Sequence, residues 1–206
     1  MKKYTNYNMC KTCGGICCQQ NGCIYMPKDF SSMSFNYLKK VIDEGNISIA
    51  GQPFNGFMGE AWSFMLYLRA RNQNANEVDL ITSGGPCKML GEDGCTLKES
   101  KRPTLGLLVK PTVIGGPCEK KFTQAYFLEW LEYNEVLAKL VTHYTNKSVA
   151  EEVIDEIAKR IKVVNDKRKI GQELTSMEAY IEKWYYSIMA NKPYYSVEEV
   201  KVLKLI

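Results

Sequence analysis

The distribution of cysteine is the feature that most constrains how this chain can fold. Of eight cysteines in 206 residues, five fall between Cys10 and Cys23, and the other three are spread from Cys87 to Cys118. Cysteines at such spacings form either a disulfide framework or a set of metal ligands. The eight positions are Cys10, Cys13, Cys17, Cys18, Cys23, Cys87, Cys95 and Cys118.

Metal binding by thiolates fits the first cluster. A Cys-x-x-Cys turn such as Cys10 to Cys13 places two sulfurs on one side of a tight loop, within reach of one ion. The following Gly14 and Gly15 allow backbone amides to turn toward those sulfurs. Zinc takes four ligands in a tetrahedron, with Zn–S about 2.3 Å. Eight thiols match two such sites, and we predict that all eight cysteines are metal ligands.

The adjacent pair Cys17 and Cys18 adds a geometric condition. Side chains of neighbouring residues diverge, so the two sulfurs serve different sites, or only one of them is a ligand. We expect the N-terminal loop to straddle the bound ions, while the three later cysteines close the coordination from the opposite side. That arrangement ties together segments separated by the 63 residues between Cys23 and Cys87.

Disulfides and dithiol redox chemistry are the alternatives. Disulfides belong mainly to exported proteins. The first residues of this chain are basic, but no apolar segment follows them as in a signal peptide. A thioredoxin-like pair at Cys10 and Cys13 would need a preceding strand, for which there is little room. We therefore expect a cytoplasmic protein with metal-bound cysteines.

Charge and hydropathy narrow the partners. Lys plus Arg is 27 and Asp plus Glu is 23, a net charge of +4. Eight thiolates with two divalent ions would add −8 + 4 = −4, so we expect the basic residues to compensate anionic sulfur. No block of Lys and Arg interleaved with aromatics occurs, which argues against nucleic-acid binding. No apolar run approaches the about 20 residues that span a bilayer, so no membrane contact is predicted.

We predict a mainly helical α+β protein in two parts. The composition, 45% hydrophobic and 24% charged, is ordinary for a globular chain. Residues 1–121 contain every cysteine, and we expect them to form an irregular, metal-stapled domain with short strands. Residues 122–206 contain none and show helical periodicity, so we expect a helical segment packed on the first part or beside it.

Particular elements are predicted in each part. One apolar face recurs over 122–144, which predicts a helix. Capping boxes of the form Ser/Thr-x-x-Glu at 148–151, 175–178 and 196–199 each predict the start of another helix. In the first part the sequence predicts a short helix, a buried strand, a connecting loop and two weaker strands. These lie, in the same order, at 35–42, 62–69, 51–59, 77–82 and 105–109.

Few other residues suggest chemistry. His143 is the only histidine and has no cysteine nearby, so a packing or surface role is expected. Glu92, Asp93 and Gly94 are best explained as a turn between two ligands. Arg102 is expected to be a charge partner of anionic sulfur. No nucleotide-binding loop, nucleophile elbow or H-E-x-x-H motif occurs, so whether the protein is an enzyme stays open.

Two blocks of sequence resemble the YkgJ-type cysteine-cluster family, which is described as zinc- or iron-chelating. The opening Cys-x2-Cys-x3-Cys-Cys at 10–18 matches one block, and the stretch 87–103, which ends in Arg-Pro, matches the other. The segment 67–71 is similar to the family's run before the second block. The resemblance covers about residues 8–121 and implies metal chelation, but it implies no particular reaction.

One position departs from the family pattern, which has a cysteine three residues after the proline of Arg-Pro, where this chain has Gly106. If that cysteine is a ligand, this chain has an open coordination position or a substitute, and Cys23 or Cys118 could supply it. Thiolates suit zinc, Cu(I) and iron–sulfur clusters alike. Because the ferredoxin spacing before a Cys-Pro is missing, we prefer one or two zinc ions, with iron or an iron–sulfur cluster as the alternative.

Three functions are compatible with such a site. A structural metal-binding module would act by binding a protein partner, and its sulfur coordination would be closed. An enzyme, either an iron or iron–sulfur redox protein or a modifying enzyme, would use an open metal position. A metal store or chaperone would release its ion reversibly without unfolding. We take the structural, partner-binding role as the primary hypothesis.

Overall fold

The computed structural model describes residues 7–20, 22–54, 63–81, 85–110, 112–115, 118–121 and 125–189. Within these ranges the chain is about half helical, and its strands form small antiparallel sheets. The predicted mixture of helices and short strands is thereby confirmed.

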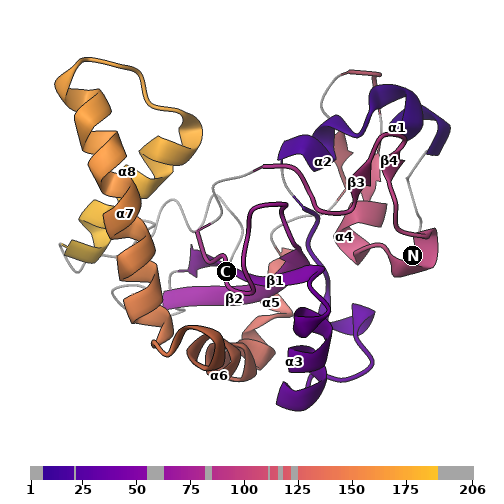
Figure 1. Ribbon diagram of the computed structural model, residues 1–206, viewed down its shortest axis with the longest axis horizontal. Helices are drawn as coiled ribbons and strands as arrows, with labels where there is room; N and C mark the ends of the chain where they lie inside the picture. Colours follow the sequence, from indigo (N-terminus) through magenta and orange to yellow (C-terminus); the bar gives the residue numbers. More distant parts are fainter. Residues whose placement is uncertain are drawn as a thin grey trace.

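A two-stranded antiparallel sheet, β1 (Ile47–Phe54) and β2 (Ser63–Ala70), lies at the centre of the molecule (Figure 1). β2 confirms the strand predicted at 62–69, except for residue 62, which lies outside the described residues. Every side chain from 64 to 70 is buried. A strand buried on both faces explains why this stretch is an almost continuous apolar run.

The strand β1 corrects the prediction of a connecting loop over 51–59. Residues 51–54 pair with β2, while 55–59 lie outside the described residues. Gly51 makes this pairing possible, because a Cβ at that position would lie 1.8 Å from the ring of Phe64. The glycine therefore marks close packing within the sheet.

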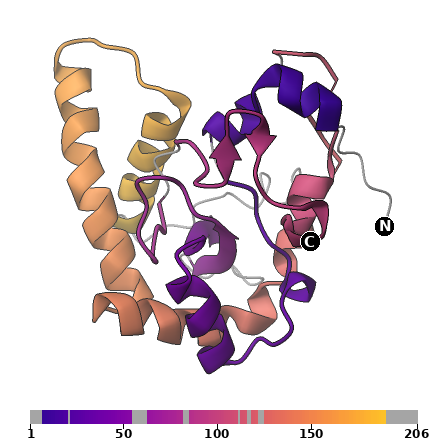
Figure 2. The ribbon, with the colours of Figure 1, turned by 45° about the vertical axis from the view of Figure 1, so that its right-hand side comes forward.

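Four helices pack around this sheet, and the bounds are α3 (Phe35–Asp43), α6 (Asn134–Thr145), α7 (Val149–Lys169) and α8 (Ser176–Met189). α3 and α6 contact each other and the sheet, and α8 pairs with α7 (Figures 1 and 2). One hydrophobic cluster joins them, and its fully buried members include Leu38, Ile49, Leu68, Leu137, Leu140 and Val153. The described helices after residue 121 therefore pack on the sheet that precedes it.

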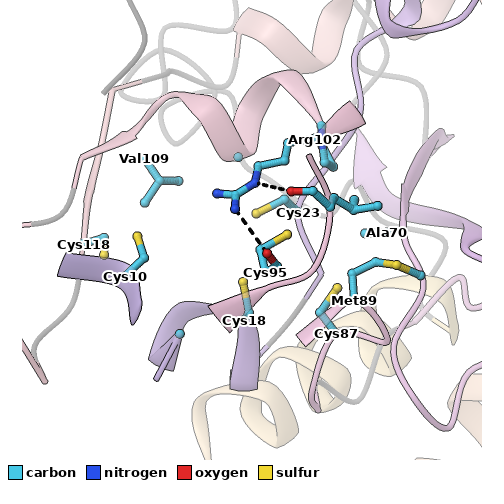
Figure 3. A pocket seen from close by; sticks show the side chains of 14 residues that line it. Cys10, Cys18, Cys23, Ala70, Cys87, Met89, Cys95, Arg102, Val109 and Cys118 are labelled. Atoms are coloured by element: carbon cyan, nitrogen blue, oxygen red, sulfur yellow. Dashed lines mark hydrogen bonds between the residues drawn. The ribbon is translucent and has the colours of Figure 1, made fainter. Parts of the chain in front are cut away.

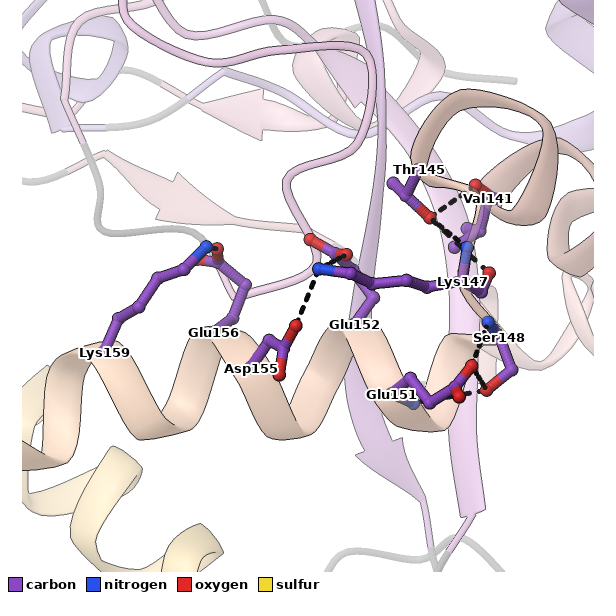
Figure 4. Close-up of polar contacts among 9 residues, drawn as sticks. All are labelled: Val141, Thr145, Lys147, Ser148, Glu151, Glu152, Asp155, Glu156 and Lys159. Carbon is purple, nitrogen blue, oxygen red and sulfur yellow. Dashed lines mark hydrogen bonds and ion pairs between the residues drawn. The ribbon is translucent and has the colours of Figure 1, made fainter.

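Both capping boxes in the described residues are formed. The hydroxyl of Ser148 accepts a hydrogen bond from the N–H of Glu151, whose carboxylate accepts one from the N–H of Ser148 (Figure 4). Thr175 and Glu178 make the same reciprocal contacts at the start of α8. These two predicted helix starts are confirmed. The helix predicted at 196–199 lies outside the described residues.

The single helix predicted over 122–144 is broken, and 122–124 lie outside the described residues. The described pieces are α5 (Ala125–Leu128), the 3-10 turn η3 (Leu131–Tyr133) and α6. The break places Trp130 in the core, where its Nε1–H donates to the carbonyl of Tyr25 at 3.0 Å. The side chain of Asn134 then bonds the backbone of β2. These contacts with the sheet override the continuous helical pattern.

Both weaker strand predictions are wrong for most of their described residues. Residues 105–107, expected in a strand, belong to a helical turn, α4 (Thr104–Leu107), and only Val109 of that stretch lies in a strand. The carboxylate of Asp29 accepts hydrogen bonds from the N–H and the hydroxyl of Thr104, which stabilises the start of that turn. Of 77–82, the described residues contribute only an isolated bridge to β1.

Short elements carry the cysteines on the side of the molecule away from α7 and α8 (Figures 1 and 2). They are α1 (Tyr7–Cys13), α2 (Ile16–Gln20), β3 (Leu90–Gly91), β4 (Gly94–Cys95), α4, β5 (Val109–Lys110) and β6 (Glu119–Lys120). Two 3-10 turns, η1 (Pro27–Asp29) and η2 (Glu99–Lys101), also precede residue 121. The turn predicted at 92–94 connects β3 to β4. Among the described residues, no helix has the length and apolar character needed to cross a bilayer.

Candidate metal centre

Six cysteines line one cavity of about 70 Å³ (Figure 3). Most of the other lining residues are apolar, and Met89 adds a thioether sulfur. Among the described residues that line the cavity, none carries a carboxylate or an imidazole. The six cysteines are Cys10, Cys18, Cys23, Cys87, Cys95 and Cys118.

The turn between α1 and α2 positions the first two sulfurs. Gly14 and Gly15 have left-handed backbone conformations, with φ of 65° and 67°, which reverse the chain between the helices. The N–H of Gly15 donates to the carbonyl of Cys10 at 3.3 Å, and its carbonyl accepts from the N–H of Cys18 at 2.7 Å. A Cβ on Gly15 would lie 2.7 Å from Cδ1 of Leu90, so only glycine lets β3 approach this closely.

Backbone hydrogen bonds join the early cysteines directly to the later block. The N–H of Cys87 donates to the carbonyl of Cys18 at 2.7 Å. The carbonyl of Cys87 accepts from the N–H of Leu90 at 3.0 Å, and Leu90 pairs with Cys95 across the β3–β4 hairpin. The fold therefore brings together sulfurs from the two cysteine blocks, as the sequence predicted.

Cys23 lies beside position 106, where the family pattern has a cysteine. A Cβ on Gly106 would lie 3.2 Å from both the Cβ and the Sγ of Cys23. That separation is shorter than the optimal carbon contact of about 3.5–4.0 Å. The carbonyl of Cys23 accepts from the N–H of Ala70 at 2.8 Å, which holds it against the end of β2. A sulfur from another segment thus fills the space into which a side chain at 106 would project.

Arg102 lies in the wall of the cavity. Its Nε donates to the carbonyl of Leu97 at 3.0 Å, and Nη2 donates to the carbonyl of Cys95 at 3.2 Å (Figure 3). The guanidinium therefore fixes the backbone that carries Cys95 and adds positive charge to the wall. Its predicted role as a partner of anionic sulfur stays a prediction.

The six sulfurs fall into two groups, with Cys10 and Cys118 at one end of the lining (Figure 3). The larger group comprises Cys18, Cys23, Cys87 and Cys95. The buried phenol of Tyr25 lies near this group. Burial raises the pKa of Tyr25, and the negative charges of Asp29 and of three of these four cysteines act in the same direction. Three sulfurs therefore lie near one buried ring.

Cys13 does not line the cavity, although the sequence predicted that it would act with Cys10. Its thiol accepts hydrogen bonds from the backbone, first from the N–H of Ile16 and next from that of Gly115, and these bonds hold the pKa of Cys13 below its ordinary value. The side chain of Cys17 lies outside the described part of the structure. For Cys13 the predicted ligand role has no support from the cavity lining, and the lining does not test the role of Cys17.

The donor set fits a thiophilic metal. The seven cysteines whose side chains are described are thiols and not halves of disulfides. Soft sulfur ligands without hard oxygen ligands suit zinc, Cu(I) or iron–sulfur clusters. Among the described residues, however, no group of three or more His, Cys, Asp or Glu side chains is arranged to hold a metal ion. The sulfurs share a cavity without forming a complete coordination sphere.

Two residues near the sulfurs were given no role from the sequence. Met89 lines the cavity, and its spacing of two from Cys87 was the only hint. Arg69 is 2% exposed, and its presence in an otherwise apolar run was a signal that a buried charge has a purpose.

Comparison with known proteins does not extend this picture. No family model, no curated protein and no solved structure gives a significant match to the chain. The resemblance to the YkgJ-type family therefore stays a prediction, and the case for a metal site depends on the cavity and its six cysteines.

Proposed function

We propose that this protein binds metal through clustered cysteine thiolates, that the metal is zinc, and that the role is structural and partner-binding. One observation carries the proposal: cysteines as distant in sequence as Cys10 and Cys118 line one cavity whose described lining offers sulfur and no carboxylate. Sulfur-only donor sets select thiophilic ions over hard cations such as magnesium. We place the protein in the cytoplasm, where thiols stay reduced.

The larger sulfur group would supply the four ligands of a tetrahedral zinc site once its side chains rotate toward one ion, since the described sulfurs do not already form that arrangement. Backbone hydrogen bonds hold its members in place. The carbonyl of Cys18 accepts from the N–H of Cys87, and the carbonyl of Cys23 accepts from the N–H of Ala70 at the end of β2. Cys95 belongs to the β3–β4 hairpin. Ligands carried on fixed backbone lose little conformational entropy when an ion binds, which favours high affinity.

A second ion would use the smaller group. Cys10 and Cys118 lie together at one end of the cavity. Cys13 accepts a hydrogen bond from Gly115, three residues before Cys118, so its sulfur belongs to the same neighbourhood. A site with only two or three protein sulfurs keeps an open position, which makes its ion exchangeable.

An iron or iron–sulfur redox or modifying enzyme is the second candidate. It is favoured by the partial exposure of Cys18, Cys23 and Cys95, and by a cavity several times the roughly 10–15 Å³ that one water molecule needs. An iron–sulfur cluster takes four cysteines, as does zinc, but needs more space between them.

The test is purification without oxygen, followed by elemental analysis and an absorption spectrum. We expect colourless protein with one or two equivalents of zinc. The variant Cys87→Ser should lose at least one equivalent, because Cys87 is 4% exposed and central to the larger group. Cys13→Ser is the matched control, which should keep the ion held by the larger group. Brown, iron-containing protein would favour the second candidate, and wild-type protein without any bound metal would overturn both.

A further inference from the structure

Arg69 carries a buried positive charge that forms no ion pair among the described residues. Its side chain is buried in β2, and among the described residues no carboxylate forms an ion pair with it. Nη2 donates to Oδ1 of Asn72 at 2.7 Å, but Nε, which is shielded from solvent, has no hydrogen-bond partner. Burying a charge without a partner costs several kcal/mol.

Arg71, two residues further along the chain, is a buried arginine whose guanidinium has hydrogen-bond partners and an ion pair. It is 6% exposed, and Nη1 pairs with Glu77 at 2.9 Å. Its Nε and Nη2 donate to the carbonyls of Ile47 and Ile42 at 2.8–3.1 Å. The two guanidiniums are buried to similar extents, so the missing partner of Arg69 is not a general property of this part of the fold.

The sulfur cavity lies next to Arg69. Ala70, the following residue, lines that cavity. Burial lowers the pKa of Arg69, and the charges of Tyr67 and Asp79, followed by those of Cys87 and Cys23, oppose that effect. Asn72, which accepts from Arg69, also pairs with Cys87 through an isolated β-bridge. Besides Asp79, the guanidinium of Arg69 therefore has two cysteines of the larger sulfur group among the charges that act on it.

We propose that Arg69 is the buried counter-charge of the metal centre and restricts it to centres that carry net negative charge. The inference rests on the proposed function. Four thiolates around one divalent ion carry −4 + 2 = −2, so such a centre adds negative charge beside a guanidinium that forms no ion pair among the described residues and on which Asp79 is the described carboxylate that acts. A centre with neutral ligands would leave the guanidinium unpaired. Arg69 thereby makes the site specific for all-thiolate coordination, as a positioning charge rather than a ligand.

The test compares Arg69→Met with Arg69→Lys and with Arg71→Met, a matched loss of a buried but satisfied charge. Zinc affinity is measured by competition with a chromophoric chelator, and chemical unfolding is followed with and without zinc. Arg69→Met should bind zinc at least about tenfold more weakly, because a nearby charge pair at an effective dielectric of about 20 exceeds the 1.4 kcal/mol that a factor of ten requires. Arg69→Lys should stay within about threefold of wild type.

The unfolding curves separate a counter-charge from a structural role. Without zinc, Arg69→Met should be no less stable than wild type, because it removes an uncompensated charge; with zinc it should be less stable. Arg71→Met should lose stability in both conditions and keep its zinc affinity. Equal zinc affinity of Arg69→Met and wild type, or equal destabilisation or misfolding of that variant in both conditions, overturns the inference alone. Wild type that binds neither zinc nor iron overturns the proposed function and the inference together.

Discussion

The two sides of this molecule are stabilised by different means. The sheet of β1 and β2, with α3 and α6 to α8, shares one hydrophobic cluster that includes fully buried residues from every one of these elements except α8, whose Ile181 and Trp184 are almost fully buried. On the cysteine-bearing side, strands β3 to β6 have two residues each, and the separate hydrophobic cluster contains only Met26, Leu105 and Leu108 as buried members. The larger cluster reaches this side through Cys87, against which partly buried residues such as Leu90 pack. Regions with so little core usually need a crosslink or a metal.

This contrast indicates which side of the molecule a bound ion would stabilise. Hydrophobic burial stabilises the sheet and its helices whether or not an ion is bound. The cysteine-bearing side has six sulfurs around a cavity and only a small share of the hydrophobic core, so an ion there would add stability to that side first.

Removal of the metal should affect one side only. Binding of structural zinc by thiolates contributes about 10–16 kcal/mol in small domains, and that contribution is lost when a chelator takes the ion. We expect amide hydrogen exchange to accelerate by several orders of magnitude in α1, α2 and the β3–β4 hairpin, while β2 and α6 keep their protection. Equal acceleration in both regions would show that the ion supports the whole fold, and no change anywhere would remove the structural role.

A core substitution should do the reverse. Leu140 is fully buried in α6, and Leu140→Ala should lower the free energy of unfolding by about 2–5 kcal/mol, because it removes buried methyl groups and leaves a cavity. Metal content per folded molecule should match wild type. The measurement is chemical denaturation followed by elemental analysis of the folded fraction. Loss of metal in this variant would mean that the sulfur site depends on the helical core.

Transfer of the thiol from position 23 to position 106 tests whether the two positions are equivalent as ligands in the cavity. Cys23→Ala should lower zinc affinity by at least about tenfold, because a ligand is lost from the larger group. The double variant Cys23→Ala with Gly106→Cys should recover most of that loss, since position 106 projects into the space that the Cys23 sulfur fills. Gly106→Ala in the same background is the control and should recover nothing. If the double variant binds no better than this control, position 106 is not equivalent to Cys23.

As the pH falls, the cysteine-bearing side should lose zinc at a higher pH than that at which α8 loses helicity. The carboxylate of Glu178 accepts first from Lys167 and next from the N–H of Thr175, and these bonds hold the pKa of Glu178 below its ordinary 4.5. These contacts therefore stabilise the folded protein at any pH above the ordinary pKa of 4.5, and this contribution is lost as the pH falls through the lower pKa that Glu178 has in the folded state. Helicity of α8 should therefore fall below about pH 4.5, while zinc leaves at higher pH because protons compete for thiolates.

A carboxylate on the other side provides the control for this titration. Glu178→Gln should reduce the ellipticity change below pH 4.5 by a modest amount, whereas Glu92→Gln, in the exposed turn between β3 and β4, should leave it as in wild type. Far-UV ellipticity and released zinc are recorded in one titration. Simultaneous loss of zinc and helix would contradict the independence of the two sides.

Local rules predicted much of the fold. The reciprocal contacts of Ser148 with Glu151 depend on four consecutive residues, so the sequence shows where α7 begins. The break before α6 could not be predicted, because it depends on Trp130 reaching the carbonyl of Tyr25, 105 residues earlier. The connecting loop predicted over 51–59 was wrong at 51–54 for the same reason, because Gly51 leaves room for the ring of Phe64 on the partner strand, which the local sequence does not show.

The candidate site likewise combines features that the sequence predicted with features that depend on tertiary contacts. Cysteine spacing predicted which residues would meet, and six of the seven cysteines whose side chains are described line the cavity. It could not predict that Cys13 would lie outside, since that depends on the N–H of Gly115. Nor could it assign a role to Arg69, because the absence of a partner becomes visible only when the surroundings of a buried charge are known.

The hydrogen bond from Cys87 to Cys18 has a consequence for biosynthesis. Ribosomes release the N-terminal sulfurs first, but the partner carbonyl and N–H cannot meet until Cys87 has emerged, and the lining is complete only after Cys118. An ion captured by the nascent first turn would therefore be held by a partial set of ligands and could still exchange. If the protein binds metal as proposed, full occupancy would be a late step of maturation, and the supply of metal at that moment would decide which ion is retained.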